Sequence, residues 1–252
     1  GKMVSGVIAT SGDLLKKDKT EVSDLVVDIG ANSWEEAAQA VSIGDPVCAD
    51  VQVRELLNDC FTCRALDDRT GAFVVLEAAR EAAAKGASIG ICAATTVGEE
   101  TTGRGAYYAA ARVRPDCAIA VDVTWASDDT GEVKVGGGPV LCMASSVNKK
   151  LNALLRETAA DLDIDVQWEI ATGRTGTDGD TVNRAGEGIP MALVSIPLQL
   201  CRGGFLEGPA GLYRPAQRVF GAPLGGDGEG LRFLYAEAVS GSAVPGPFKS
   251  GR

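Results

Sequence analysis

Acidic side chains follow short apolar runs at three places in the chain and could together hold metal ions. They are the pairs Asp67-Asp68 and Glu99-Glu100 and the single Asp122. Because parallel strands bring their carboxyl ends to one edge of a sheet, we expect these carboxylates to converge. Converging carboxylates repel one another unless cations hold them, and oxygen ligands suit divalent metals. Two ions roughly 3.5 to 4 Å apart, bridged by a carboxylate, would activate water and polarise a carbonyl, and the Glu that is not a ligand would be the general base.

Two other interpretations of these residues stay open at this point. Acidic residues also stand at strand ends and helix N-termini without any catalytic role, because the helix dipole favours them there. The strand predicted over 87–97, followed by Gly103-Arg104-Gly105 and then by Asp122, also imitates a dinucleotide-binding fingerprint. Glu99 and Glu100 would place negative charge beside the pyrophosphate in such a site, so the fingerprint is the weaker interpretation.

The absence of histidine restricts the chemistry more than any other count. It removes Ser-His and Cys-His nucleophile pairs and every imidazole metal ligand from this chain. The seven cysteines are an odd number, so reduced thiols are expected rather than a disulfide framework. Cys60 and Cys63 form the one close pair, and a zinc site of the paired type would need a second. Acid–base chemistry must therefore use carboxylates, Lys, Tyr or Cys.

The charge balance argues against several classes of partner. The 252 residues include 24 Lys and Arg against 34 Asp and Glu, which gives a net charge of −10. This charge disfavours nucleic acid and an anionic membrane surface as partners. No run approaches the roughly 18 uncharged apolar residues that a membrane helix needs, and residues 1–5 do not resemble a signal peptide. We therefore expect a soluble, cytoplasmic protein.

Alternating strand and helix patterns must position the carboxylates from residue 56 onward. The predicted helices cover 70–84, 107–112 and 149–162, and the predicted strands cover 87–97, 117–121, 166–170 and 191–196. This alternation predicts an α/β fold, a three-layer α/β/α sandwich with a mostly parallel sheet. Residues 56–200 are expected to form this catalytic-type domain.

The two flanking segments have different patterns. Residues 1–55 are predicted to be part of a small β-rich domain that serves packing or dimerisation, with strands over 4–9, 24–29 and 47–53 and one helix after Ser33. Residues 201–252 are crowded with Gly and Pro and show no sustained period, so we expect an irregular, divergent tail. The tail is either a real extension or the product of a reading-frame shift near Gln199.

Motifs spread over residues 4–198 resemble those of the M42 metallopeptidases, a family of glutamyl-aminopeptidase-like dinuclear enzymes that form tetrahedral dodecamers. The matching segments, in the family's order, are Gly6-Val7-Ile8, Asp28-Ile29-Gly30-Ala31, Ala65-Leu66-Asp67-Asp68-Arg69, Thr96-Val97 with Glu99-Glu100, Arg104-Gly105-Ala106, Ala120-Val121-Asp122-Val123-Thr124, Gly136-Gly137-Gly138-Pro139, Gly176-Thr177-Asp178 and Ser195-Ile196-Pro197-Leu198. The resemblance implies a zinc-peptidase-like fold, peptide substrates, a homo-oligomer and two divalent metal ions, which are zinc, cobalt or manganese.

The resemblance also implies a role for each acidic residue. Asp67 would bridge both metals, Glu100 would bind one metal and Asp122 the other, and Glu99 would be the general base. The supporting residues around the site would be Asp68, Thr177 and Asp178.

This sequence departs from the family pattern where histidines are expected. One histidine ligand would fall in a segment before Gly1, as if the chain began inside the small β-rich domain, and the second would fall near Arg202. Gly98 stands where a Gln is usual, and Trp125 where a His is common. Two functions follow as expectations: an aminopeptidase impaired by its missing His ligands, or a catalytically inactive homologue with a structural or regulatory role in an oligomer.

Overall fold

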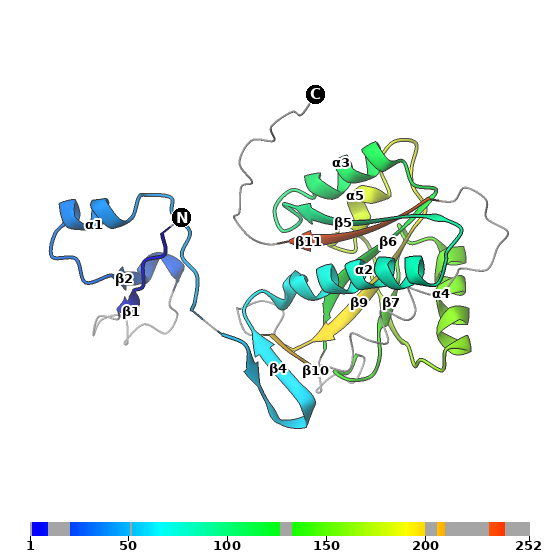
Figure 1. Ribbon diagram of the computed structural model, residues 1–252, viewed down its shortest axis with the longest axis horizontal. Coiled ribbons are helices and arrows are strands. Elements are labelled where there is room, and N and C mark those ends of the chain that lie inside the picture. The colour runs from blue at the N-terminus through cyan, green and yellow to red at the C-terminus, as the bar shows by residue number, and fades with distance from the viewer. Residues whose placement is uncertain are drawn as a thin grey trace. The chain divides into compact units, whose positions relative to one another are not determined.

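The computed structural model describes residues 2–9, 21–50, 52–126, 133–199, 206–209 and 232–239. These residues belong to two compact units, Gly1–Cys48 and Ala49–Arg252 (Figure 1). Within the described ranges, no helix is both long enough and apolar enough to cross a membrane.

The first unit is a short β-ribbon with small helices. Its strands β1 (Val7–Ala9) and β2 (Val26–Asp28) pair antiparallel, and a 3-10 turn, η2 (Val22–Asp24), precedes β2. The helix α1 (Trp34–Ala40) begins at Ser33, whose Oγ accepts a hydrogen bond from the Glu36 backbone N–H at 3.2 Å. The predicted helix and the first two predicted strands are therefore confirmed. The third predicted strand, 47–53, is wrong for its described residues, because no partner strand lies beside it and Val47 stays 74% exposed.

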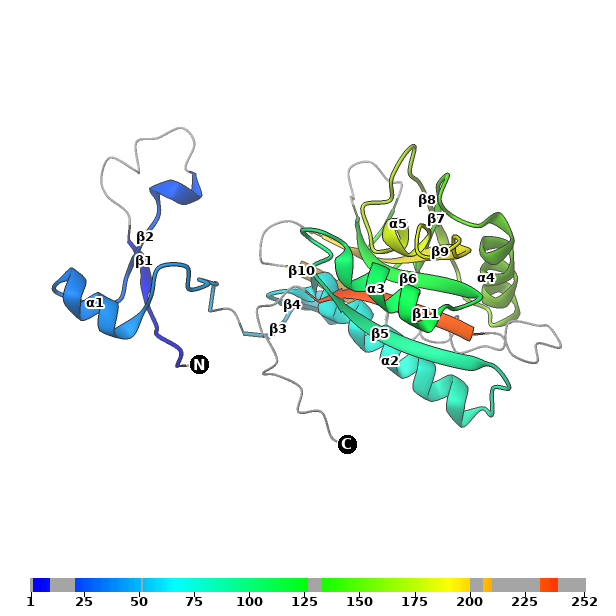
Figure 2. The ribbon, with the colours of Figure 1, turned by 90° about the horizontal axis from the view of Figure 1, so that it is seen from above.

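The second unit is built on a six-stranded mixed sheet, shown from two sides in Figures 1 and 2. In spatial order its strands are β5 (Gly90–Val97), β11 (Arg232–Val239), β6 (Cys117–Trp125), β9 (Met191–Leu198), β7 (Val140–Met143) and β8 (Gln167–Ile170). All neighbours run parallel except β7 and β9. The predicted α/β fold with a mostly parallel sheet is therefore confirmed.

Helices cover both faces of this sheet and give it two apolar cores. One core joins the sheet to α2 (Leu66–Ala84) and α4 (Lys149–Asp161), and the other joins it to α3 (Arg104–Val113) and α5 (Gly179–Val182). Side chains alternate across a strand, so on β6 Ile119 belongs to the first core and Ala120 to the second. Burial on both faces explains why the predicted central strands read as continuous apolar runs.

A second, smaller sheet contains the strand that precedes α2. Its antiparallel strands lie in the order β10 (Leu206–Pro209), β4 (Cys60–Cys63) and β3 (Arg54–Glu55), with the short turn η3 (Leu57–Asp59) between β3 and β4. Cys60 and Cys63 are both strand residues. Two strands, β10 and β11, lie in the segment for which an irregular tail is predicted. Most of that segment, on which the extension and frame-shift alternatives depend, lies outside the described residues.

Candidate metal centre

Asp67 and Asp68 stand at the start of α2 rather than at the end of a strand of the main sheet. The strand before them, β4, belongs to the small antiparallel sheet, so the predicted shared edge of parallel strands is wrong for this pair. Asp68 is fully buried, and its Oδ1 accepts hydrogen bonds from the Gly71 N–H at 2.8 Å and the Thr70 hydroxyl at 3.1 Å. Asp68 therefore accepts a backbone N–H of the first turn of α2 that has no partner within the helix. This hydrogen bond fixes the backbone that carries Asp67.

Glu99 and Glu100 follow β5 directly, as predicted. The chain turns at Gly98, which adopts φ +74°, and the Gly98 carbonyl accepts hydrogen bonds from the N–H groups of Thr102 at 2.8 Å and Gly103 at 2.7 Å. Glycine is the residue best suited to this backbone conformation. The turn leaves Glu99 half-buried and Glu100 exposed.

Asp122 lies inside β6 rather than after it. The strand continues to Trp125 because its ladder with β9 continues, and Asp122 is paired in register with Ser195. The Asp122 side chain is 8% exposed, and its Oδ1 accepts the Val123 N–H at 2.7 Å. A carboxylate buried in a central strand at this depth is costly when charged, unless a cation or proton compensates.

The electrostatics show that the fold nevertheless brings these carboxylates together. Burial, and then the charge of Glu100, raise the pKa of Asp67 to about 6. Burial and the neighbouring charges, first Asp178 and then Glu100 and Asp67, raise the pKa of Glu99 to about 7. Burial and the charge of Asp68 hold the pKa of Asp122 well above its usual value. Such repulsion acts between groups that lie in one region of the fold, but no three of the described acidic side chains lie close enough to hold one ion.

The segment before α5 supplies another buried acid. Asp178 is 2% exposed, and its Oδ2 accepts a hydrogen bond from Thr96 Oγ1, which ties this segment to the carboxyl end of β5. Its second oxygen, Oδ1, has no hydrogen-bond partner among the described residues. Burial raises the pKa of Asp178 to about 6 against the opposing effect of the Thr96 hydrogen bond.

Thr177 and Asp180 shape the same loop. The Oγ1 of Thr177 accepts the Gly179 N–H at 3.2 Å and lies 3.0 Å from the Thr175 hydroxyl. Asp180, which the sequence did not single out, accepts the N–H groups of Thr175 at 3.1 Å and Gly176 at 3.0 Å. Burial would raise the pKa of Asp180, but these hydrogen bonds outweigh it and lower the value. The repeated Gly and Asp of residues 176–180 were the signal that could have predicted such a turn.

Comparisons with known proteins identify the family of this chain. The model of the M42 glutamyl aminopeptidase family matches residues 2–202. The chain belongs to this family. A putative aminopeptidase of Acetivibrio thermocellus is 36% identical over 203 residues, which are 78% of this chain and 60% of that protein. The lysyl aminopeptidase of Pyrococcus furiosus is 34% identical over 186 residues, which are 72% of this chain and 53% of that protein.

Solved structures of similar fold include another aminopeptidase. The TET aminopeptidase of Thaumarchaeota archaeon SCGC AB-539-E09 superposes with a TM-score of 0.74 at 29% identity, over 86% of this chain and 66% of that one. This M42 chain thus spans between about half and two thirds of the length of these three relatives.

M42 peptidases use divalent metal ions, and the donors in this chain suit such ions chemically. Converging carboxylates with raised pKa values, together with the unpartnered Oδ1 of Asp178, offer negative charge that a cation would stabilise. Within the described part of the chain, however, no three Asp, Glu or Cys side chains are already placed to hold one ion. Trp125 is 52% exposed at the end of β6, and Arg202 lies outside the described residues.

Proposed function

We propose that this chain carries the hydrolytic site of a metal-dependent aminopeptidase, which removes N-terminal residues from peptides. The observation that supports the proposal is the cluster of Asp67, Glu99, Glu100 and Asp122, whose mutual repulsion and burial raise three of the four pKa values. Carboxylates held at such a cost to stability are typical of functional sites. Both relatives compared above are named as aminopeptidases, one as a putative aminopeptidase and the other as a lysyl aminopeptidase.

In this proposal Asp67 would be a ligand shared by both divalent ions, Glu100 would hold one of them and Asp122 would hold the other. Divalent ions, when bound, polarise a carbonyl oxygen and acidify water. Glu99 is the general base, because it is the one acid of this cluster that is not assigned to an ion, and a carboxylate beside activated water can accept its proton. Asp68 acts through Asp67 by fixing the first turn of α2, and Asp178 acts through Thr96 by fixing the end of β5 before Glu99.

The donor set also bears on the identity of the ion. Zinc, cobalt and manganese are the candidates, and the described side chains of the cluster, Asp67, Glu99, Glu100 and Asp122, all offer oxygen donors. Manganese accepts all-oxygen ligand sets more readily than zinc, which prefers nitrogen and sulfur. We therefore expect manganese to support the highest activity.

Hydrolysis of aminoacyl-p-nitroanilides tests the proposal. The chain is assayed with zinc, cobalt and manganese, and in parallel with the variants Glu99→Gln and Glu187→Gln. Loss of a general base is expected to reduce kcat by about 100-fold or more, whereas Glu187 is exposed and its variant should retain full activity. Absence of turnover with every metal, or full activity of Glu99→Gln, would contradict the proposal.

A catalytically inactive homologue with a structural or regulatory role is the second candidate. It is favoured by the lack of any histidine and by the lack of a preassembled group of three ligands in the described ranges. Calorimetric titration with manganese separates the two candidates. Stoichiometric binding that Asp67→Asn abolishes would count against the inactive homologue, and no binding by the unaltered chain would support it.

Self-association is part of the same proposal, since the first unit displays apolar side chains to solvent. Among them are Val7, Ile8, Trp34 and Ile43, which are between 57% and 90% exposed. Exposed apolar groups on one small unit favour a protein interface. Sedimentation of the chain as a monomer at all concentrations up to the solubility limit would refute a homo-oligomer.

A further inference from the structure

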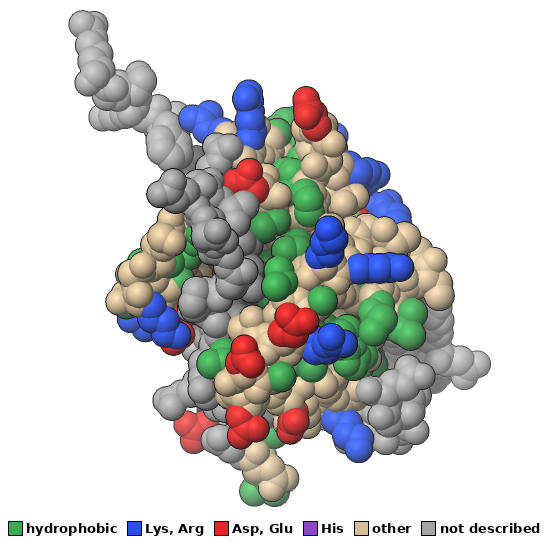
Figure 3. All heavy atoms as spheres, turned by 90° about the vertical axis from the view of Figure 1, so that its right-hand side faces the viewer, with side chains coloured by type: hydrophobic (Ala, Val, Ile, Leu, Met, Phe, Trp, Pro, Cys, Tyr) green, Lys and Arg blue, Asp and Glu red, His purple; other side chains and the backbone are tan. Residues whose placement is uncertain are grey.

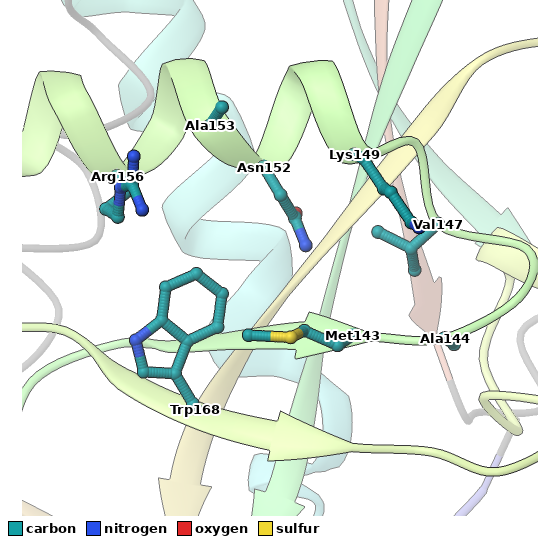
Figure 4. A pocket seen from close by; sticks show the side chains of 8 residues that line it. All are labelled: Met143, Ala144, Val147, Lys149, Asn152, Ala153, Arg156 and Trp168. Carbon is teal, nitrogen blue, oxygen red and sulfur yellow. The ribbon is translucent and has the colours of Figure 1, made fainter.

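A cavity of about 220 Å³ lies between α4 and the strands β7 and β8, and none of its lining residues belongs to the carboxylate cluster (Figure 4). Its apolar walls come from Met143, Val147, Ala153 and Trp168, and its polar groups come from Lys149, Asn152 and Arg156. Pockets for drug-sized ligands usually measure about 300 to 1,000 Å³. This pocket is smaller, so it has room for a group about the size of one amino-acid residue.

Asn152 lines this pocket and has a hydrogen-bond acceptor without a partner among the described residues. The residue is 8% exposed, and its Nδ2 donates to the Cys142 carbonyl at 2.7 Å, which fixes the orientation of the amide. Its Oδ1 is buried and has no hydrogen-bond partner among the described residues. Figure 4 shows the amide projecting from α4 toward Met143 on β7. A ligand with an N–H or O–H group would satisfy this oxygen.

Two cations flank the same pocket. Lys149 and Arg156 lie seven positions apart on α4 and share one helix face with Asn152. Both side chains are exposed, and neither forms an ion pair with another residue of the described part. The space-filling view that includes α4 shows Lys and Arg side chains beside apolar ones (Figure 3). Two unpaired cations at an apolar pocket, in a chain of net charge −10, favour an anionic ligand.

We propose that this pocket binds an apolar residue that bears a free carboxylate and a neutral N–H group, as the C-terminal residue of a peptide does. The apolar side chain packs against Met143 and Trp168, the N–H donates to Asn152 Oδ1, and the carboxylate pairs with Arg156 or Lys149. A free amino acid would present a charged ammonium group instead of the neutral N–H. The two cations repel that ammonium group, so a peptide C-terminus fits the pocket better.

Binding of N-acetyl-L-leucine to the 252-residue chain tests the inference. Calorimetry measures the affinity, and the ¹⁵N-labelled indole signal of Trp168 reports on the site, with the signal assigned from Trp168→Phe. N-acetyl-L-leucinamide, which lacks the carboxylate, and free leucine should each bind about tenfold more weakly or worse. Arg156→Gln or Lys149→Gln should weaken the binding of N-acetyl-L-leucine by a similar factor.

The matched control is Lys150→Gln, because Lys150 is an exposed cation next to Lys149 that does not line the pocket. The Lys150→Gln chain should bind N-acetyl-L-leucine with the same affinity as the unaltered chain. The inference is overturned if N-acetyl-L-leucine does not bind at millimolar concentration or leaves the Trp168 signal unchanged. It is equally overturned if N-acetyl-L-leucinamide or free leucine binds as tightly as N-acetyl-L-leucine. The same holds if neither Arg156→Gln nor Lys149→Gln weakens the binding of N-acetyl-L-leucine. Both substituted cations are exposed, so far-UV circular dichroism should show unchanged folding.

Discussion

Replacement of Glu99 by Gln should stabilise the metal-free chain at alkaline pH and leave its stability unchanged in acid. Glu99 has a pKa of about 7 in the folded chain against an ordinary value of 4.5. Between these two values the unfolded chain has already released this proton while the folded chain keeps it. The folded state is therefore favoured below pH 4.5, and that contribution is lost as pH rises to about 7.

The size of the effect follows from the pKa difference. A rise from 4.5 to about 7 corresponds to about 3.4 kcal/mol, at about 1.36 kcal/mol per pKa unit. The side chain is only half-buried, so solvent screening reduces the expected gain to about 1–2 kcal/mol. Glutamine keeps the size of the side chain and removes the charge that Asp178, Glu100 and Asp67 repel.

Urea unfolding in the presence of a chelator, followed by circular dichroism at pH 4 and pH 8, measures this gain. The Glu99→Gln chain should be more stable at pH 8 by about 1–2 kcal/mol and equal to the unaltered chain at pH 4. Glu187→Gln, an exposed control, should show no difference at either pH. The reasoning is refuted if the two chains lose stability in parallel between pH 4 and pH 8, or if Glu99→Gln is the less stable chain at pH 8.

Three further substitutions test how the framework is built. Gly105→Ala should lower the thermal midpoint and destabilise the fold by about 1–3 kcal/mol, because the added Cβ would lie 2.5 Å from the backbone N and O of Val97. The control is Gly173→Ala, which should change the thermal midpoint very little, since the space around Gly173 is open. Gln167→Ala should lower the free energy of unfolding, measured in urea, by about 1–3 kcal/mol, because it removes three hydrogen bonds. The Nε2 of Gln167 donates to the carbonyls of Lys134 at 2.9 Å and Gly138 at 3.0 Å, and its Oε1 accepts the Lys134 N–H at 2.8 Å. A neutral result would mean that solvent replaces these bonds. Ser33→Ala should reduce the stability of α1 by about 1 kcal/mol, read from amide exchange within 34–40, and unchanged exchange there would rule out the cap.

Elements with local signals were predictable. Ser33 caps its own helix through a residue three positions away, so the bounds of α1 can be read without any tertiary information. The alternation of β6 and β9 with helices was predictable as well, because strands buried on both faces have continuous apolar sequences. The strand expected over 47–53 failed for the opposite reason, since none of the strands in the described ranges pairs with its β-prone residues.

The site depended on contacts that no local pattern encodes. The apolar run before Asp67 looks like the end of a sheet strand, but β4 pairs with β3 and β10 in a different sheet. Asp178 reaches the site through a hydrogen bond to Thr96, which is 82 positions away. Asp180 was not predicted to matter, because its partners are backbone N–H groups that converge only once the loop has formed.

The sequence by itself determined the donor chemistry, namely carboxylates without any imidazole, and it contains the motifs that place the chain in the M42 family. Only the tertiary structure decided which carboxylates share a region, how deeply each is buried and therefore which pKa values rise. The reason is physical: residue type sets the ordinary pKa of a group, whereas desolvation and repulsion act through space and exist only after distant segments have packed together.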